Sequence, residues 1–282
     1  MKKFFRKALV ISIIMMSMIG CSNSEQIDYD SRLLESGEQA IIDFGVIPNR
    51  TFDVTLEDGI YTANINGDIQ KVQLPTKNDS KKLSVTEIEK TNRKTDKIAQ
   101  KALEKVLEYV KASKTLKEKQ HILEELKKID IKTACVDAPA MYEDGNIYIG
   151  KDYLDVVCEW MIVHEYIHGL AAITNGGVEN ERYAYYQFDE AMTDIITYTL
   201  TPEIPDGYQS GYVQYYDTIV LYVGCFGEKA ISAYFYGYDE IIDITGEVEL
   251  DFFVNSFENM YDSEVAMVCV YNGINKWAQM DT

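Results

Sequence analysis

Two histidines one helical turn apart, with a glutamate next to the first, form the strongest chemical pattern in this sequence. His164 and His168 are two of the three histidines in the chain, and Glu165 directly follows His164. Residues four apart on a helix share one face, so both imidazoles could bind one metal ion from the same side. Glu165 would lie about 100° further round the helix. There it could accept a proton from a metal-activated water without binding the metal itself.

The flanking residues predict that this helix runs through a hydrophobic core. Residues 160–163, Ile167 and Leu170 are all apolar, as expected for a buried helix. A buried helix with two hydrogen-bonded histidines, or a structural zinc site, would show the same pattern, so the motif alone leaves these alternatives open. The third histidine, His121, lies among charged residues and is expected on a solvated helix face.

A catalytic zinc ion needs one more protein ligand than the two histidines supply. Glu190 and Asp194 lie four apart in the next helical stretch and therefore share a face. One carboxylate could bind the zinc, and the other could accept the free N–H of a ligand histidine and fix its orientation. A solvated acidic face is the alternative. The apolar residues Met192, Ile195 and Ile196 favour a partly buried helix instead.

The segment HEYIH followed by ExxxD resembles the gluzincin metallopeptidases, the group that includes thermolysin-like enzymes. The resemblance covers about residues 146–200. It implies a zincin-like catalytic domain that hydrolyses peptide bonds with Zn²⁺ as the cofactor. The residues it assigns are the zinc ligands His164, His168 and Glu190, the general base Glu165, and Asp194 as the hydrogen-bond partner of His164.

Two departures from this group limit what the resemblance implies. Residues 176–180 look like the Gly-x-Met-Glu-Asn motif of gluzincin aminopeptidases, but that motif precedes the zinc helix there and follows it here, so an aminopeptidase is not expected. Thermolysin-like enzymes also use a downstream histidine to stabilise the oxyanion, and none follows His168. Arg182 or a tyrosine could do this instead. The candidate tyrosines are Tyr208, Tyr212, Tyr215, Tyr216, Tyr222, Tyr234, Tyr236 and Tyr238.

The N-terminus has the pattern of an export signal. Basic residues precede an apolar run over residues 8–19, which is shorter than the roughly 20 residues of a membrane-spanning helix. Cys21 follows Gly20 directly, which resembles a bacterial lipoprotein signal that is cleaved before Cys21 and leaves lipid on its thiol. Met18 and Ile19 depart from the Leu and small residue favoured there, so a plain secretory signal or an uncleaved anchor is the alternative. We expect a protein anchored to the outer face of a bacterial membrane.

Charge is unevenly distributed along the chain. Residues 21–76 carry 3 basic and 10 acidic side chains, residues 77–128 carry 15 and 9, and residues 129–282 carry 5 and 27. The resulting net charges are −7, +6 and −22. Such a surface excludes nucleic acid as a partner, because phosphates would be repelled. An acidic cleft could favour cationic peptides.

Length and patterning predict three parts: a signal peptide at 1–20, a tether, small β-rich region and linker at 21–82, and a catalytic domain at 83–282. The predicted class is α+β, mostly helical with a small sheet. The strands expected in the N-terminal region are 41–44, 51–56 and 60–65, the last two joined by a hairpin at Asp58-Gly59, with a further hairpin at Asn66-Gly67. The polar linker is expected at 75–82.

Capping patterns at 84–87 and 115–118 predict the starts of two helices. Strands are expected at 131–136 and 146–149. Asp152 could cap the zinc helix, which is expected to end near residue 175. The edge of strand 146–149 could pair with an extended substrate. Three or four further helices are expected over residues 209–280.

Four cysteines follow Cys21 in the sequence. Outside the cytosol they could form two disulfides, but their apolar neighbours favour buried thiols. These residues are Cys135, Cys158, Cys225 and Cys269.

The sequence therefore predicts an exported, membrane-tethered zinc metallopeptidase. A lipoprotein that binds a partner and keeps the zinc helices only as structure is the main alternative, and hydrolysis of a non-peptide amide is a third. The retained Glu165 favours an enzyme, because a structural site has no need of a base.

Overall fold

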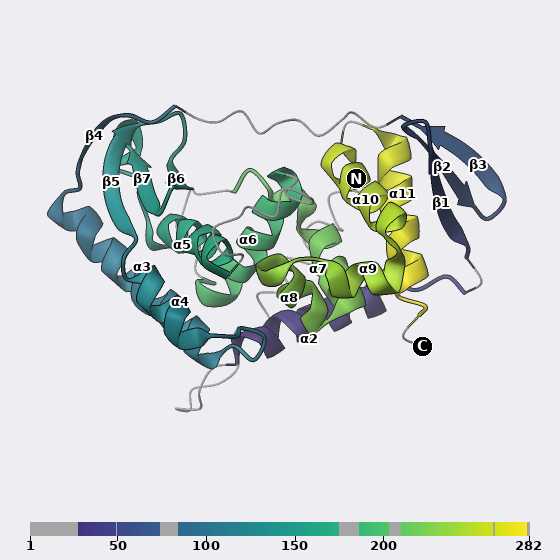
Figure 1. Cartoon of the computed structure of the whole chain (residues 1–282), viewed down its shortest axis with the longest axis horizontal. Coiled ribbons are helices and arrows are strands. Elements are labelled where there is room, and N and C mark those ends of the chain that lie inside the picture. The colour runs from purple at the N-terminus through teal and green to yellow at the C-terminus, as the bar shows by residue number, and fades with distance from the viewer. Residues whose placement is uncertain are drawn as a thin grey trace.

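The computed structural model describes residues 28–48, 50–73, 84–174, 186–202, 210–261 and 263–280. Within them the chain forms an α+β fold of ten α-helices and two small sheets, which confirms the predicted class. The sheets lie at opposite ends of the molecule and the helices fill the space between them (Figure 1). In the described part of the chain, no helix combines the length and apolar character needed to cross a bilayer.

The three-stranded sheet consists of β1 (Phe52–Glu57), β2 (Ile60–Ile65) and β3 (Asp68–Val72), paired antiparallel in sequence order. Asp58, Gly59, Asn66 and Gly67 all have positive φ in the two connecting turns. Two-residue turns of this kind match the twist of the strands, so both predicted hairpins are confirmed. Phe52 and Tyr61 pack on Phe252 of α10 (Glu247–Asn259), which attaches this sheet to the C-terminal helices.

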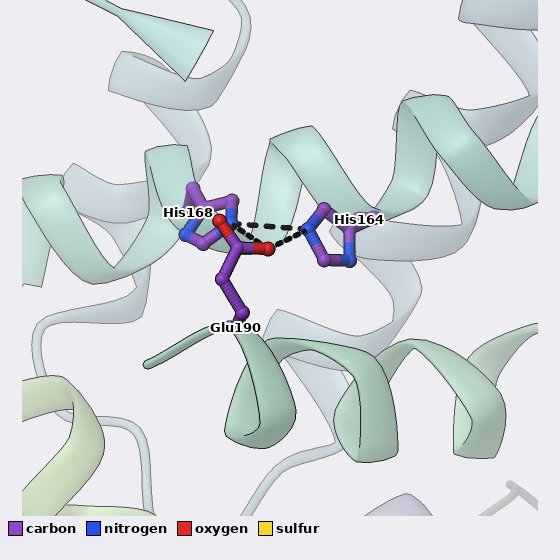
Figure 2. A group of neighbouring side chains, drawn as sticks. All are labelled: His164, His168 and Glu190. Atoms are coloured by element: carbon purple, nitrogen blue, oxygen red, sulfur yellow. Dashed lines mark hydrogen bonds and ion pairs between the residues drawn. The ribbon is translucent and has the colours of Figure 1, made fainter. Parts of the chain in front are cut away.

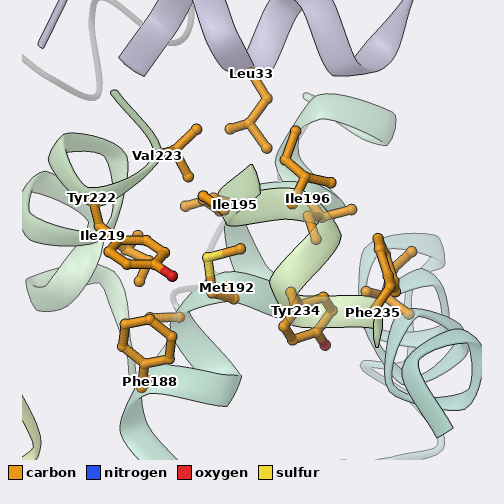
Figure 3. Packing of buried hydrophobic residues seen from close by; sticks show 14 of the residues in the cluster. Leu33, Phe188, Met192, Ile195, Ile196, Ile219, Tyr222, Val223, Tyr234 and Phe235 are labelled. Carbon is orange, nitrogen blue, oxygen red and sulfur yellow. The ribbon is translucent and has the colours of Figure 1, made fainter. Parts of the chain in front are cut away.

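The prediction that residues 41–44 form a strand is wrong. They end the helix α2 (Tyr29–Phe44), which Asp28 caps by accepting from the Ser31 amide at 3.1 Å. Tyr29, Leu33 and Ala40 recur at helical spacing and form its buried face. Figure 3 shows Leu33 directed from α2 into the cluster around Ile195 and Ile196. The N-terminal region therefore contributes a helix to the main core.

The second sheet has the order β4-β5-β7-β6, with bounds β4 (Thr86–Lys90), β5 (Asp130–Cys135), β6 (Ala140–Glu143) and β7 (Asn146–Gly150). Strands β5 and β7 are parallel, and the other pairs are antiparallel. The strands predicted at 131–136 and 146–149 are confirmed, whereas β6 was not predicted. Because β5 and β6 occupy both edges of β7, the prediction that β7 presents an open edge to substrate is wrong.

Both predicted helix starts are also wrong. Residues 84–87 lead into strand β4, and α3 (Arg93–Ala112) begins after Asn92, whose side chain accepts from the amides of Lys94 at 2.9 Å and Thr95 at 3.0 Å. The next helix, α4 (Lys119–Leu126), begins after Glu118 without a side-chain cap. At 84–87 the strand β4 includes Glu87, which would complete the cap. At 115–118 the amides of Thr115 and Lys117 instead donate to Asp30 and to the hydroxyl of Tyr236.

The two helices that carry the metal-binding pattern are α5 (Glu159–Thr174) and α6 (Tyr186–Leu200). Asp152 lies in the short 3-10 turn η1 (Lys151–Tyr153) and does not cap α5. The predicted end of α5 near residue 175 agrees with its last helical residue, Thr174. The linker at 75–82, residues 176–180, Arg182, Tyr208 and Cys21 lie outside the described residues.

The C-terminal part forms five helices where three or four were expected. After the 3-10 turn η2 (Val213–Tyr215) they are α7 (Tyr216–Phe226), α8 (Glu228–Tyr236), α9 (Asp239–Thr245), α10 and α11 (Glu264–Trp277). Gly227, Gly237 and Gly246 have positive φ and separate α7 to α10. A backbone with positive φ suits glycine and ends a helix. The positions of these glycines therefore explain why this region forms more helices than expected.

The four cysteines at 135, 158, 225 and 269 are free, as the apolar surroundings indicated. Cys225 and Cys269 are buried, and the other two are partly buried.

Helices α2 and α7 approach each other through glycines. A Cβ at Gly224 would lie 2.3 Å from the carbonyl oxygen of Gly37, and one at Gly37 would lie 2.6 Å from the Gly224 nitrogen. No side chain fits at either position without separating the two backbones.

We therefore expect Gly224→Ala to lower the free energy of unfolding by about 1–3 kcal/mol, the usual cost of overpacking. Chemical denaturation would measure it. Gly211→Ala is the control, because a Cβ there meets nothing within 4 Å. Equal stability of the two variants would contradict this account of the α2–α7 contact.

Candidate metal centre

Helix α5 places both histidines inside the protein. Its apolar residues are buried on nearly every side, which explains why the whole segment forms one helix despite its lack of a polar face. His164 is 7% exposed and Glu165 is 8% exposed. Gly169 lets the ring of Tyr142 in β6 approach the helix, since a Cβ there would lie 3.0 Å from that ring.

Helix α6 brings a carboxylate to the same point. Glu190 lies one turn inside the helix, and Glu258 of α10 accepts from the Phe188 amide at 2.8 Å, which satisfies a free N–H in the first turn of α6. Burial raises the pKa of Glu258 to about 7, although the amides of Phe188 and Gln187 oppose the shift. A carboxylate from another helix therefore fixes the end of α6 from which Glu190 projects.

Three potential ligand atoms converge between α5 and α6. The Nε2 atoms of His164 and His168 are 3.1 Å apart, and Oε2 of Glu190 lies 3.1 Å from the first and 3.7 Å from the second. Figure 2 shows both imidazoles pointing toward Glu190. This is the one group of three such residues that could hold a metal ion among the described residues.

Carboxylates on the far side of each imidazole determine what these atoms can do. Asp194 Oδ1 lies 2.8 Å from Nδ1 of His164, and Asp189 Oδ2 lies 3.2 Å from Nδ1 of His168. Each carboxylate favours a proton on the Nδ1 that it faces, and in a neutral ring with that proton Nε2 is left as an acceptor. Two such nitrogens and the oxygen of Glu190 repel one another, and either a proton or a metal ion between them relieves the repulsion.

The separations fit zinc. Ligands at about 2.0–2.1 Å from a tetrahedral zinc ion lie about 3.3 Å from one another, close to the observed 3.1–3.7 Å. Two imidazoles and one carboxylate, with a fourth position open, are also a ligand set that catalytic zinc uses. The residues present therefore suit this ion.

The charges around the site are strongly coupled. Burial lowers the pKa of His164, but the bonded carboxylates of Asp194 and Glu190 raise it by more, to about 10. Burial raises the pKa of Glu190, but the adjacent histidines lower it by more. Protons and a metal ion would therefore compete for the same nitrogens, and binding zinc would release protons.

Glu165 lies beside the three-residue group and is separate from it. Burial raises the pKa of its carboxyl, and the neighbouring histidines oppose that shift. The backbone of Tyr142 also opposes the shift. A raised pKa brings a carboxylate closer to the range in which it can both accept and release a proton at neutral pH.

A second layer of hydrogen bonds holds Asp194 in place. This carboxylate is fully buried, and it accepts from the hydroxyl of Tyr216 at 2.7 Å and from that of Ser210. On the other histidine, Thr193 lies 3.4 Å from Nδ1 of His168 and 2.5 Å from the hydroxyl of Tyr234. Residues from α7 and α8 thus orient the imidazoles indirectly.

One pair of tyrosine hydroxyls lies at the entrance to the site. Tyr186 is 50% exposed and one helical turn before Glu190, so both lie on the same face of α6. Its hydroxyl is 2.5 Å from that of Tyr212. Burial raises the pKa of Tyr186, the bond to Tyr212 opposes this, and the charges of Glu190, His168 and Glu165 act on it too.

The structure brings together all five residues predicted around the metal, and it adds three. His164, Glu165, His168, Glu190 and Asp194 gather between α5 and α6, whereas His121 is exposed and 3.8 Å from Glu125. The residues not predicted are Asp189, Tyr186 and Glu258. The sequence could have indicated Asp189 and Tyr186, because they lie one and four positions before Glu190 on the same helix. Nothing in the sequence near Glu190 indicated Glu258, which lies on α10.

No known protein family, no curated protein and no solved structure matches this chain.

We expect Glu190→Ala to abolish most zinc binding, because it removes one of three ligand atoms. Asp194→Ala should weaken binding about 10–100-fold, the usual effect of a partner that only orients a ligand. Metal content after dialysis against zinc, with melting temperature to verify folding, would test both. Asp243→Ala, an exposed carboxylate on α9, is the control. Full zinc loading of Glu190→Ala would refute this ligand set.

Proposed function

We propose that this chain is an exported, lipid-anchored zinc metallopeptidase of gluzincin type. The observation that carries the proposal is the convergence of three acceptor atoms, on His164, His168 and Glu190, with Glu165 beside them. A structural zinc site is normally closed by four protein ligands. Three ligands with an adjacent carboxylate favour hydrolysis.

Zinc held there would polarise a substrate carbonyl and lower the pKa of a water to about 7. Glu165 would accept the proton of the attacking water and later deliver it to the leaving amine. Asp194 and Asp189 would keep the ligand imidazoles in a single orientation during this reaction.

The open edge of β6 is the proposed contact for the substrate backbone. Glu143 and Asn146 form the hydrogen-bonded pair that closes a two-residue turn. Hydrogen-bonded and non-hydrogen-bonded pairs alternate along an antiparallel ladder, so the next pair, Tyr142 and Ile147, is non-hydrogen-bonded. The amide of Tyr142 therefore points away from β7. The backbone of Tyr142 lowers the pKa of Glu165, so we infer that the outer edge of β6 lies near this carboxylate. An extended peptide paired with this edge would lie along the site. The acidic surface favours cationic peptides as its substrates.

Tyr186 is the proposed donor to the oxyanion. Its half-exposed side chain lies on the face of α6 that holds Glu190, whereas Tyr234 is 5% exposed and bonded to Thr193. A donor must reach the substrate oxygen, so the exposed tyrosine suits this role better.

Glu165→Gln distinguishes an enzyme from a structural zinc site. The change keeps the size of the side chain and removes its ability to accept a proton. We expect zinc content and melting temperature near wild type, while cleavage of a peptide library falls by about 10²–10⁴-fold. Loss of zinc would instead identify Glu165 as a ligand. Undiminished cleavage by the zinc-loaded variant would rule out the mechanism.

Tyr186→Phe tests the oxyanion donor. We expect kcat to fall by about 10²–10³-fold, the effect of removing one such donor, with zinc content unchanged. Tyr236→Phe is the matched control, since its hydroxyl binds the backbone of Lys117, on another part of the protein. Equal kcat for Tyr186→Phe and wild type would exclude this assignment.

A further inference from the structure

Helices α3 and α4 carry a charge opposite to that of the residues that follow. Residues 93–128 contain 11 basic and 6 acidic side chains, against 5 and 27 in residues 129–282. Lys111 and Lys117 are exposed at the junction of the two helices, and Lys127 is exposed directly after the end of α4. Glu104 and Glu108 are exposed in the middle of α3, so the positive charge gathers toward its two ends: residues 93–101 carry 4 basic and 1 acidic side chains, and residues 111–119 carry 4 and 1.

The first described residues of the chain are fixed to this junction. Asp30 is 2% exposed and accepts from the Ser113 hydroxyl at 2.7 Å and from the Lys114 amide at 2.8 Å. The ammonium of Lys114 pairs with Asp28 at 2.5 Å. Helix α2 therefore begins against the end of α3, beside the start of α4 (Figure 1).

The chain between the expected lipid and this point is short. Seven residues, 21–27, precede Asp28. At no more than about 3.5 Å per residue they span at most about 25 Å. Lipid on Cys21 would therefore hold the α3–α4 junction close to the membrane surface, and no other part of the fold is tethered so directly.

We propose that the junction face, defined by Lys111, Lys114, Lys117 and Lys127, docks on the anionic phospholipid headgroups of the membrane. The inference rests on the lipid anchor included in the proposed function. Lysines within about 8 Å of an anionic surface are attracted to it at physiological salt. The strongly acidic C-terminal part is repelled, so the molecule has one favourable orientation.

This orientation keeps the metal centre away from the lipid. Helix α3 packs against α5, whereas His164 and His168 point from α5 toward Glu190 on α6 (Figure 2). The candidate site thus lies between α5 and α6, whereas the lysines of the junction face belong to α3, α4 and the residues beside them, and both of these helices pack against α5. A peptide could reach the free edge of β6 from solution while the enzyme stays on the membrane.

The test uses the processed chain from residue 21 with Cys21→Ser, so that lipid does not contribute to binding. Cosedimentation would compare phosphatidylcholine vesicles with and without phosphatidylglycerol. The combined variant Lys111→Gln, Lys117→Gln and Lys127→Gln should lower the partition onto anionic vesicles by about 100-fold, at about fivefold per lysine. The control Arg50→Gln, Lys71→Gln and Lys90→Gln removes the same charge elsewhere and should retain most binding.

Zinc content and peptide cleavage in solution separate this inference from the proposed function. Both lysine variants should match wild type in these two measurements. Selective vesicle binding without zinc or cleavage would support the docking face and refute the metallopeptidase. No binding of the parent chain to anionic vesicles, equal binding to neutral vesicles, or equal loss in both variants would overturn the docking face.

Discussion

Two carboxylate–imidazole contacts determine the arrangement of the candidate site. Asp194 lies 2.8 Å from Nδ1 of His164 and Asp189 lies 3.2 Å from Nδ1 of His168, while both Nε2 atoms face Glu190. A buried carboxylate is costly unless it is hydrogen-bonded, and Asp194 meets this need through Ser210 and Tyr216. The site is therefore a network of residues from α5, α6 and α7, and its geometry depends on how these helices pack.

That packing relies on elements from both ends of the chain. Helix α2 fits closely against α7 through Gly37 and Gly224, and Leu33 contacts the cluster on α6. At the other end, Glu258 of α10 fixes the first turn of α6. The sheet contributes Tyr142, whose ring packs on Gly169 beside His168 and whose backbone lowers the pKa of Glu165. Each side chain of the site is thus positioned by a tertiary contact as well as by its own helix.

These contacts explain which features the sequence could predict. Periodicity and spacing are local, so they could predict helix α5, the shared face of Glu190 and Asp194, and the turns at Asp58-Gly59 and Asn66-Gly67. The capping pattern at 84–87 failed because β4 pairs with β5, whose residues lie about forty positions later. Strand β6 is only four residues long. Its place at the edge of the sheet depends on its pairing with β7, which the residues of β6 alone do not predict.

The joining of distant segments also has a consequence for the proposed export across a membrane. Helix α2 packs on α7, and strands β1 and β2 pack on Phe252, so the first elements find their partners only when the last third of the chain is present. Contacts between distant segments slow folding, because long loops must close first. In a chain threaded N-terminus first, α2 and the three-stranded sheet would therefore stay unpacked until the C-terminal helices emerge. This delay would suit the proposed export through a narrow channel, and it would leave the buried face of α2 in need of protection until the core closes.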